Sequence, residues 1–312
     1  MEVIHNIENI SIKKPIAAIG IFDGVHLAHQ KIIERLNQRA KEYAGSSVII
    51  TLWPHPKHII KSKDHFELKL LTTLDEKINI LEAFGIQYLV VLEFNMKLAR
   101  LSFEDFTKQI LCDKLGINHL IVGFNHQFGK NRQGNFEKLE NLKGRCHFGL
   151  EQIEPFLFEN EKVSSSLIRN LVKEGDVLGT AKILGRPYEI TGIVGSGNRI
   201  GREIGFPTAN IKIDDEHKLI PKTGVYAVNI ILGNKIYKGM LNIGTRPTVD
   251  SKGQQVIEVN IFDFDENIYD QKASVKFIER IRDEIKFDNV NSLKSQLIND
   301  KETVKLVLSR NK

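Results

Sequence analysis

The stretch from Ile16 to Trp53, IAAIGIFDGVHLAHQKIIERLNQRAKEYAGSSVIITLW, decides the fold of the first half of the chain. An apolar run leads into a glycine-containing turn, and apolar residues at helical spacing follow until Gly45, after which a β-branched run begins. This order indicates a strand, an amphipathic helix and a second strand. Such a unit predicts two parallel strands joined by a right-handed crossover.

The same pattern recurs twice further along the chain. Apolar stripes at helical spacing end at Gly85 and Gly116, and each is followed by a strand-like run, at 86–94 and at 117–124. Thr73 and Glu76 have the spacing of a capping box at the start of one of these helices. The first half is therefore predicted to be an α/β domain around a parallel sheet. Ligands of such sheets bind beyond the carboxyl ends of the strands, which selects residues 23–29, 54–56 and 125–129.

The second half has a different pattern. From Glu189 onward the apolar residues fall in short, alternating runs, and a Gly233-Asn234 pair between two of them is a two-residue hairpin signal. Further strands are expected at 256–262 and 273–278, and a closing helix at 290–308. This predicts a small antiparallel β-barrel with a C-terminal helix. We place the domains at residues 1–185 and 186–312.

Composition narrows the class of protein. The 312 residues, with 41% hydrophobic and 27% charged, suit two folded domains, and the net charge of +5 suits anionic ligands such as nucleotides, or a nucleic acid. The N-terminus lacks a signal-peptide block and no apolar run could span a bilayer, so no membrane partner is expected. Cys112 and Cys146 form no CxxC motif, and Cys112 is expected to be a small core residue in a reducing cytoplasm.

The first candidate site is the segment GIFDGVHLAH, residues 20–29. Gly20 and Gly24 permit a tight turn, and His26 and His29 lie three apart, on one face of the following helix. A helix N-terminus carries free N–H groups and partial positive charge, so imidazoles beside it favour a polyphosphate. Taken alone, an H-x-x-H pair is more often a polar helix start, and the glutamate of an H-E-x-x-H metal site is missing.

Other polar segments follow the predicted strands of the first domain. His55 lies in the stiff loop WPHP, and Asn125 lies in GFNHQFG after the fourth strand. Ser164 and Ser165 open a later helix that carries Arg169, and hydroxyl groups with an arginine at a helix start form an anion-binding element. The two helix starts together could hold a triphosphate.

The second candidate site lies in the barrel. Its opening segment is rich in glycine, including Gly195, Gly197 and Gly201 next to Arg202, and it ends in GFPTAN. In an extended segment Thr208 and Asn210 face the same side, and their oxygens suit Mg²⁺. On the strand at 256–262, Glu258 lies opposite the apolar face and could accept a proton from an attacking alcohol. The alternatives are a flexible loop and a solvent-facing glutamate.

The motifs of the first domain, taken in order, resemble the adenylyltransferase domain of bacterial bifunctional riboflavin kinase/FAD synthetases. These motifs are FDGVHxxH, PHP, LTTLDEK, GxNxxFG and SSSxIR. The resemblance implies a Rossmann-like nucleotidyltransferase in which FMN attacks the α-phosphorus of ATP and pyrophosphate leaves. It implies that His26 and His29 stabilise the ATP phosphates. By the same match His55 holds the flavin and Asn125 helps hold the flavin nucleotide or ATP. The expected ATP contacts are Gly20, Phe22, Asp23, Gly24, Ser164, Ser165 and Arg169.

The motifs of the second domain resemble the riboflavin kinase domain of the same family. They are GFPTAN, GVYAV, NIGTRPT, IEVNIFDF and RDExKFD. The resemblance implies that Thr208 and Asn210 bind Mg–ATP and that Glu258 deprotonates the ribityl hydroxyl of riboflavin. It further implies that Gly195, Gly197, Gly201 and Arg202 contact ATP, and that Arg282 and Phe287 belong to a flavin-covering loop. The expected ligands are Mg²⁺, ATP, riboflavin and FMN.

Two positions depart from the family pattern. Ala28 stands where the family has glycine, and His126-Gln127 replace an aromatic residue and an arginine before Phe128. They motivate a second hypothesis, a riboflavin kinase with a degenerate first domain. A third is an RNA-binding regulator, although the barrel lacks a row of exposed aromatic residues for base stacking, so no nucleic-acid partner is expected. The sequence assigns no oligomeric state.

Overall fold

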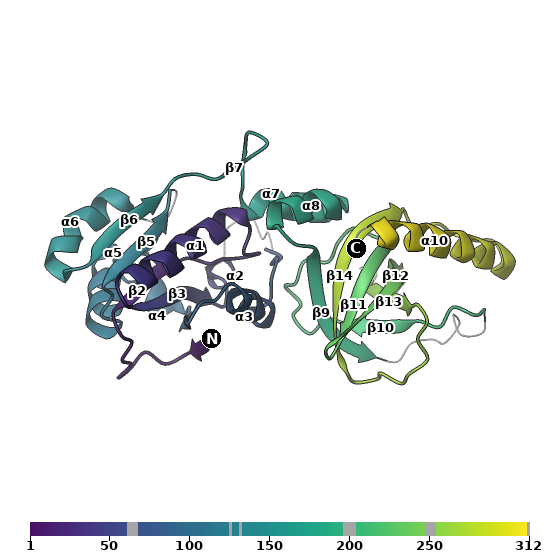
Figure 1. The fold of residues 1–312 in the computed structure, drawn as a ribbon, viewed down its shortest axis with the longest axis horizontal. Helices are drawn as coiled ribbons and strands as arrows, with labels where there is room; N and C mark the ends of the chain where they lie inside the picture. Colours follow the sequence, from purple (N-terminus) through teal and green to yellow (C-terminus); the bar gives the residue numbers. More distant parts are fainter. Residues whose placement is uncertain (61–67, 125–126, 131–132, 196–203, 247–253, 311–312) are drawn as a thin grey trace. The chain divides into compact units, whose positions relative to one another are not determined.

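The computed structural model describes residues 1–60, 68–124, 127–130, 133–195, 204–246 and 254–310 (Figure 1). The chain divides into two compact units, Met1–Ser165 and Ser166–Lys312. The first unit contains the predicted parallel sheet and the second contains the predicted barrel.

The first unit is built on a six-stranded parallel sheet in the order β1-β4-β3-β2-β5-β6. Its strands are β1 (Glu2–Ile4), β2 (Pro15–Ile19), β3 (Ser46–Trp53), β4 (Tyr88–Glu93), β5 (His119–Gly123) and β6 (Gly149–Ile153). The four strands from β2 to β5 were predicted, and the two edge strands were not. β2 ends at Ile19, and the turn after it contains Phe22, Gly24 and Val25 with φ values of 50°, 82° and 41°, which no strand has.

Helices cover both faces of this sheet. On one face α1 (Leu27–Glu42) and α3 (Leu74–Ala83) pack on Ala18, Ile49 and Leu89. On the other face α5 (Phe103–Phe106), η1 (Thr107–Lys114) and α6 (Phe136–Cys146) pack on Val48, Ile50 and their neighbours. Residues 48 to 50 alternate between the faces, as a strand requires. The remaining elements are α2 (Pro56–Ile59), α4 (Met96–Ala99), β7 (Leu157–Phe158) and β8 (Glu161–Lys162).

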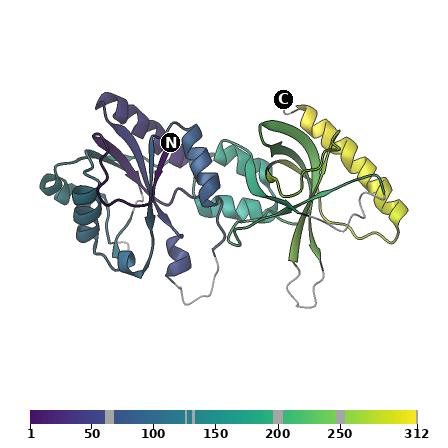
Figure 2. The ribbon, with the colours of Figure 1, turned by 90° about the horizontal axis from the view of Figure 1, so that it is seen from below.

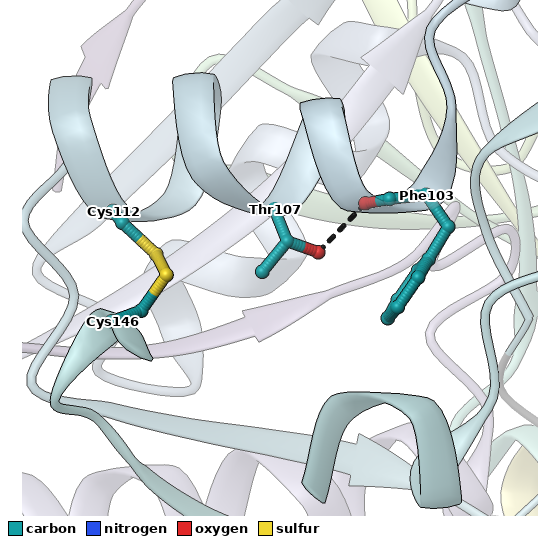
Figure 3. Close-up of a disulfide and its surroundings, with 4 residues drawn as sticks. All are labelled: Phe103, Thr107, Cys112 and Cys146. Carbon is teal, nitrogen blue, oxygen red and sulfur yellow. Dashed lines mark hydrogen bonds between the residues drawn. A yellow bond between two sulfur atoms is a disulfide. The ribbon is translucent and has the colours of Figure 1, made fainter. Parts of the chain in front are cut away.

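The helix predicted to end at Gly116 consists of α5 and a wide π-helical second part, η1. At its start the Thr107 hydroxyl donates to the Phe103 carbonyl at 2.9 Å (Figure 3). Near its end Cys112 forms a disulfide with Cys146 of α6, with the two Cα atoms 5.8 Å apart. Cys112 packs against the hydrophobic core, as predicted, but the sequence analysis did not predict its disulfide. The pairing was missed because it needs the last turns of η1 and α6 side by side, and no sequence spacing encodes that.

The second unit contains a closed antiparallel barrel in the order β10-β13-β12-β11-β14-β9. Its strands are β9 (Tyr188–Gly195), β10 (Ala209–Lys212), β11 (Gly224–Leu232), β12 (Lys235–Arg246), β13 (Gln254–Ile261) and β14 (Lys272–Arg282). Leu232 and Lys235 pair across the predicted Gly233-Asn234 turn, which confirms the hairpin. The barrel interior is filled by side chains that are fully buried, among them Tyr226, Val228, Leu241, Val259 and Phe277.

The described residues of the second unit also form the helices α7 (Ser165–Glu174), which starts at the division between the units, α8 (Val177–Leu184) and α10 (Val290–Arg310). α10 lies along the outside of the barrel (Figure 2). Its Val304, Val307 and Leu308 pack on the outward side chains Val225, Ala227 and Met240. Across the described part of the chain, no helix combines the length and the apolar character that crossing a bilayer would need.

Candidate functional site

The segment between β2 and α1 forms a compact loop at the carboxyl edge of the first unit's sheet. His26 is the N-cap of α1 and is 5% exposed, and its ring stacks on that of His29 with centroids 3.7 Å apart. The first turn of α1 contains no acidic residue, so nothing on the helix offsets the partial positive charge of its N-terminus. The structure therefore brings the two imidazoles together at this helix end, on one face as predicted from the spacing.

The loop conformation depends on Gly24. Its φ of 82° lies in the left-handed region, which favours glycine, and its N–H donates to the Thr72 hydroxyl at 3.1 Å. Gly20 precedes the turn and lies against the Phe22 ring, which in turn lies 5.0 Å from the His29 ring. Ala28 is the second residue of α1 and is half-buried, so the helix start accommodates its methyl group.

Asp23 joins the segments of this site. Its buried carboxylate accepts hydrogen bonds from the backbone N–H groups of Leu71 and Thr72, each at 3.0 Å, and from the Thr72 hydroxyl at 3.3 Å. Its carbonyl accepts a hydrogen bond from the Ser165 hydroxyl at 3.0 Å. Asp23, predicted to contact ATP, therefore ties the loop before α1 (residues 20–26, the histidine loop) to residues 71–72 and to Ser165.

The other residues predicted for the adenylyltransferase site lie in several different elements. His55 is the N-cap of α2, and its Nδ1 accepts a hydrogen bond from the Lys57 N–H at 3.1 Å. Ser164 directly precedes α7, and Arg169 lies in that helix, within the second unit. Asn125 and His126 lie outside the described residues. Next to them, Phe128 packs on Phe103 with ring centroids 5.0 Å apart.

Sequence reasoning missed Lys77, a buried cation behind this loop. Lys77 of α3 is 1% exposed, and its Nζ lies 3.4 Å from the Thr51 hydroxyl and 5.5 Å from the centre of the Trp53 ring. Burial lowers the pKa of Lys77 to about 8, although the charge of Asp23 acts to raise it. Its position in the LTTLDEK motif was visible, but its burial against Thr51 and Trp53 requires the fold.

The predicted barrel residues lie along one row of the sheet. The register pairs Gly195 with Asn210, Asn210 with Glu258, and Glu258 with Asn242. It continues from Asn242 to Val225 and from Val225 to Arg282. Directly opposite residues of paired strands share a face, and Val225 packs on α10, so the whole row faces outward. Asn210, Glu258 and Asn242 are therefore neighbours on the outer surface.

Thr208 belongs to the same surface, since it lies two residues before Asn210 and is exposed. Asn210 itself is 8% exposed, and the segment before it is held by Asn260, whose amide donates to the Pro207 carbonyl at 2.7 Å. Gly195 contributes no side chain beside Asn210. The result is a cluster of hydroxyl, amide and carboxylate oxygens, the hard ligands that Mg²⁺ prefers, so these residues fit such an ion.

Asn242 and Glu284 extend this cluster and were not predicted. A Cβ added at Gly244 would lie 2.6 Å from the Glu284 Oε1 and 3.1 Å from the Asn242 Nδ2, so both side chains occupy the space above that glycine. Asn242 opens the NIGTRPT motif, but its place beside Glu258 follows only from the β12–β13 register. Gly197, Gly201 and Arg202 lie outside the described residues.

Arg282 has structural partners in this fold. Its Nε lies 3.0 Å from one oxygen of Asp300 and its Nη2 lies 2.6 Å from the other, so a two-point ion pair ties β14 to α10. Asp300 is 2% exposed. Phe287, predicted with Arg282 to cover a flavin, is half-buried in the segment between β14 and α10.

Comparisons with known proteins assign a flavin-enzyme family to each part of the chain. Residues 9–167 match the family model described as FAD synthetase, and residues 184–308 match the one described as riboflavin kinase. A bifunctional riboflavin kinase/FMN adenylyltransferase from Bacillus subtilis is 38% identical, over 93% of this chain and 91% of the relative. Its counterpart from Escherichia coli K12 is 31% identical over 97% of this chain and 95% of the relative.

A solved structure shares the whole fold. A crystal structure from Streptococcus pneumoniae, described as a macrolide-efflux protein, superposes with a TM-score of 0.86 at 30% identity. The match covers 97% of this chain and 98% of that one. Both units thus occur in the same order in a single known chain.

Proposed function

We propose, from the premise that the chain belongs to the bifunctional riboflavin kinase/FMN adenylyltransferase family, that it makes FAD from riboflavin in two ATP-dependent steps. Riboflavin is phosphorylated to FMN, and FMN is then adenylylated to FAD with release of pyrophosphate. The observation that carries the proposal is the match of both family models, in order, to nearly the whole chain. We assign adenylyltransfer to residues 1–185 and phosphorylation to residues 186–312.

The kinase step is assigned to the outer row of the barrel. Glu258 lies between Asn210 and Asn242 across the strands, and we assign it the role of general base for the ribityl hydroxyl. The oxygen of that alcohol attacks the γ-phosphorus of ATP, its proton passes to the Glu258 carboxylate, and ADP leaves. Thr208 and Asn210 would hold a magnesium ion, which when bound supplies charge neutralisation for the phosphates. Asn242 and Glu284 border the same surface and would orient the substrates.

The adenylyltransfer step is assigned to the loop before α1. A phosphate oxygen of FMN attacks the α-phosphorus of ATP, and the bond from that phosphorus to the pyrophosphate oxygen breaks. No enzyme nucleophile is needed, so catalysis rests on positioning and on stabilising negative charge. The stacked His26 and His29 at the α1 N-terminus supply that stabilisation. Ser164, Ser165 and Arg169 are assigned to ATP, and His55 and Asn125 to the flavin.

The expected partners are small molecules: ATP, riboflavin and FMN. We place the protein in the cytoplasm. The efflux activity named for the Streptococcus pneumoniae structure is not carried over, because the curated relatives that match more than nine-tenths of this chain are named as flavin enzymes.

A product assay tests the proposal. Purified protein is given riboflavin, ATP and Mg²⁺, and FMN and FAD are separated over time; FMN should rise first and FAD should follow. A second reaction starts from FMN. If FMN accumulates from riboflavin while FMN gives no FAD above the enzyme-free background, the first unit is a degenerate scaffold and the chain is a kinase only. If neither product forms, both assignments are wrong.

A further inference from the structure

The short segment that leads into β10 and carries Thr208 is fastened to the barrel at two points. The first contact is apolar, because Phe206 is 8% exposed and packs with Phe262 in the cluster beneath α10. The Nζ of Lys301 lies 5.3 Å from the centre of the Phe262 ring and 6.0 Å from that of Phe206. Burial of apolar surface has no preferred direction, so this contact fixes where the segment lies but not how its backbone is turned.

The second contact is a directional hydrogen bond from Asn260. Its amide donates to the Pro207 carbonyl at 2.7 Å, and Asn260 is 5% exposed. A buried amide left without a partner is costly, so this hydrogen bond is strongly favoured over its broken form. The Pro207 carbonyl and the Thr208 N–H belong to one planar peptide group. Asn260 therefore sets the orientation of the peptide that leads directly into Thr208.

Thr208 needs such a support because it precedes the strand ladder. β10 begins at Ala209, which is paired with Val259, and the next pair is Asn210 with Glu258. The same register, continued by one residue, would place Asn260 opposite Thr208. At this point the side chain of Asn260 takes over from the backbone ladder and holds the Pro207 carbonyl. The ladder thus places Asn210, and the amide of Asn260 places the residue before it.

We propose that Asn260 is a positioning residue of the kinase site: by holding the Pro207 carbonyl, its amide aims the Thr208 hydroxyl at the magnesium ion that Thr208 shares with Asn210. The inference rests on the proposed riboflavin kinase function of the second unit. Glu258 is placed by the ladder, so loss of this hydrogen bond should disturb Thr208 and leave the base in position. The defect should therefore appear in the use of Mg²⁺ and MgATP and not in the KM for riboflavin.

The first test is the kinetics of riboflavin phosphorylation by the full chain, measured as the sum of FMN and FAD at varied Mg²⁺, MgATP and riboflavin. Asn260→Leu removes the donor without a large change in size. Asn260→His keeps a donor, because the histidine Nδ1 is separated from Cα by as many bonds as the asparagine Nδ2. Thr191→Val is the control, since it removes a hydroxyl of the same barrel that lies 2.9 Å from the Ser274 hydroxyl.

A second measurement is independent of activity. Hydrogen exchange of peptides that span residues 204–212, recorded without ligands, reports whether the segment is held. Exchange there should be faster in Asn260→Leu than in the wild type, whereas peptides from β11 and β12 should be unchanged, because their ladders do not include this hydrogen bond.

For Asn260→Leu we expect the Mg²⁺ concentration at half-maximal rate and the KM for MgATP to rise about tenfold, as when the support of a metal ligand is lost. The KM for riboflavin should stay within twofold of the wild type. Asn260→His should recover most of the loss, and Thr191→Val should behave as the wild type. Thr208→Val, at an exposed position, should reproduce the Mg²⁺ defect.

Wild-type Mg²⁺ dependence in a folded Asn260→Leu protein would overturn the proposal. A parallel rise of the KM values for riboflavin and MgATP, or faster exchange throughout the barrel, would also overturn it, because either marks a general loosening. An unchanged Mg²⁺ dependence in Thr208→Val would do the same, and that result does not require Asn260→Leu to fold. Failure of the proposed function is separate, because it appears as absent FMN formation by the wild type.

Discussion

The two candidate sites of this chain are held together in different ways. The barrel site lies on one row of paired strands, in which the register alone makes Asn210, Glu258 and Asn242 neighbours. The site of the first unit is formed by separate segments that meet through the hydrogen bonds of Asp23. A site on a strand row has its geometry fixed by the backbone ladder, whereas a site in loops depends on a few side chains that support them. Variants should expose this difference.

The largest effect is expected at Glu258. Glu258→Gln keeps the size of the side chain but removes its basicity, so riboflavin phosphorylation should fall by about 10²–10⁴-fold. FMN-to-FAD conversion should stay within twofold of the wild type, because the strand register is unchanged. Both activities are measured by product separation, with the exposed Glu266→Gln as the matched control. A variant that keeps full kinase activity would refute the assigned base.

His29 should show the opposite selectivity. His29→Ala removes one of the two stacked rings at the start of α1, and FAD formation should fall by about 10²–10³-fold, as when one stabilising donor is lost from a developing anion. Riboflavin phosphorylation should be retained. His5→Ala, at an exposed position of the same unit, is the control. Equal loss of both activities would contradict the separation of the sites.

A smaller effect, on stability rather than on activity, is expected at the ion pair between Arg282 of β14 and Asp300 of α10. Asp300→Asn removes the charge that pairs with Arg282 and should lower the free energy of unfolding by roughly 3 kcal/mol, because a largely buried guanidinium loses its partner. Urea denaturation monitored by circular dichroism measures this. At a temperature where the variant is folded, its KM for riboflavin should match the wild type. A raised KM with unchanged stability would instead support the flavin contact expected for Arg282.

An effect of similar size on stability is expected for the disulfide between Cys112 and Cys146, which closes a loop with a sequence separation of 34. Its loss should cost roughly 2–4 kcal/mol of unfolding free energy in the first unit and leave the barrel unaffected. Thermal unfolding of the wild type with and without a thiol reductant, beside Cys112→Ser, measures it. A reductant effect that persists in Cys112→Ser would assign the change to another cause.

Buried Lys77 adds a pH dependence with a definite sign. Its folded pKa of about 8 lies below the ordinary value near 10.4, so between these pH values the unfolded chain binds more protons than the folded chain. This group therefore lowers stability below pH 8, and the penalty is relieved as the pH rises from about 8 to about 10.4. Lys77→Met should be at least as stable as the wild type at pH 7, with a flatter pH profile. A strongly destabilised variant would indicate a purely structural lysine.

The sequence predicted those features that repeat along the chain. Glycine-ended helices followed by β-branched runs gave the parallel sheet, the capping box at Thr73 is present, and the turn at Gly233 joins two paired strands. The alternation of residues 256–262 placed Glu258 on the face opposite the core. Such patterns are local consequences of periodicity, so they can be recognised without a structure.

Features that depend on distant contacts could not be predicted. Asn242 joins Glu258 only through the register of β12 and β13, and Arg282 meets Asp300 only when α10 lies on the barrel. Asp23 was singled out as an ATP contact, and the hydrogen bonds of its carboxylate to the backbone at 71–72 could not be foreseen. These contacts depend on packing between segments far apart in the chain, which no short motif records.

The central claim is that one chain carries two independent sites. Mixing two variants that each lack one activity tests this claim most directly. Glu258→Gln and His29→Ala are each given riboflavin, ATP and Mg²⁺, separately and then mixed. Separately, neither should form FAD at more than a few per cent of the wild-type rate. The mixture should form FAD after a lag, because FMN released by the His29 variant can be used by the Glu258 variant. A mixture of folded proteins that still forms no FAD, although each retains its remaining activity, would contradict the account.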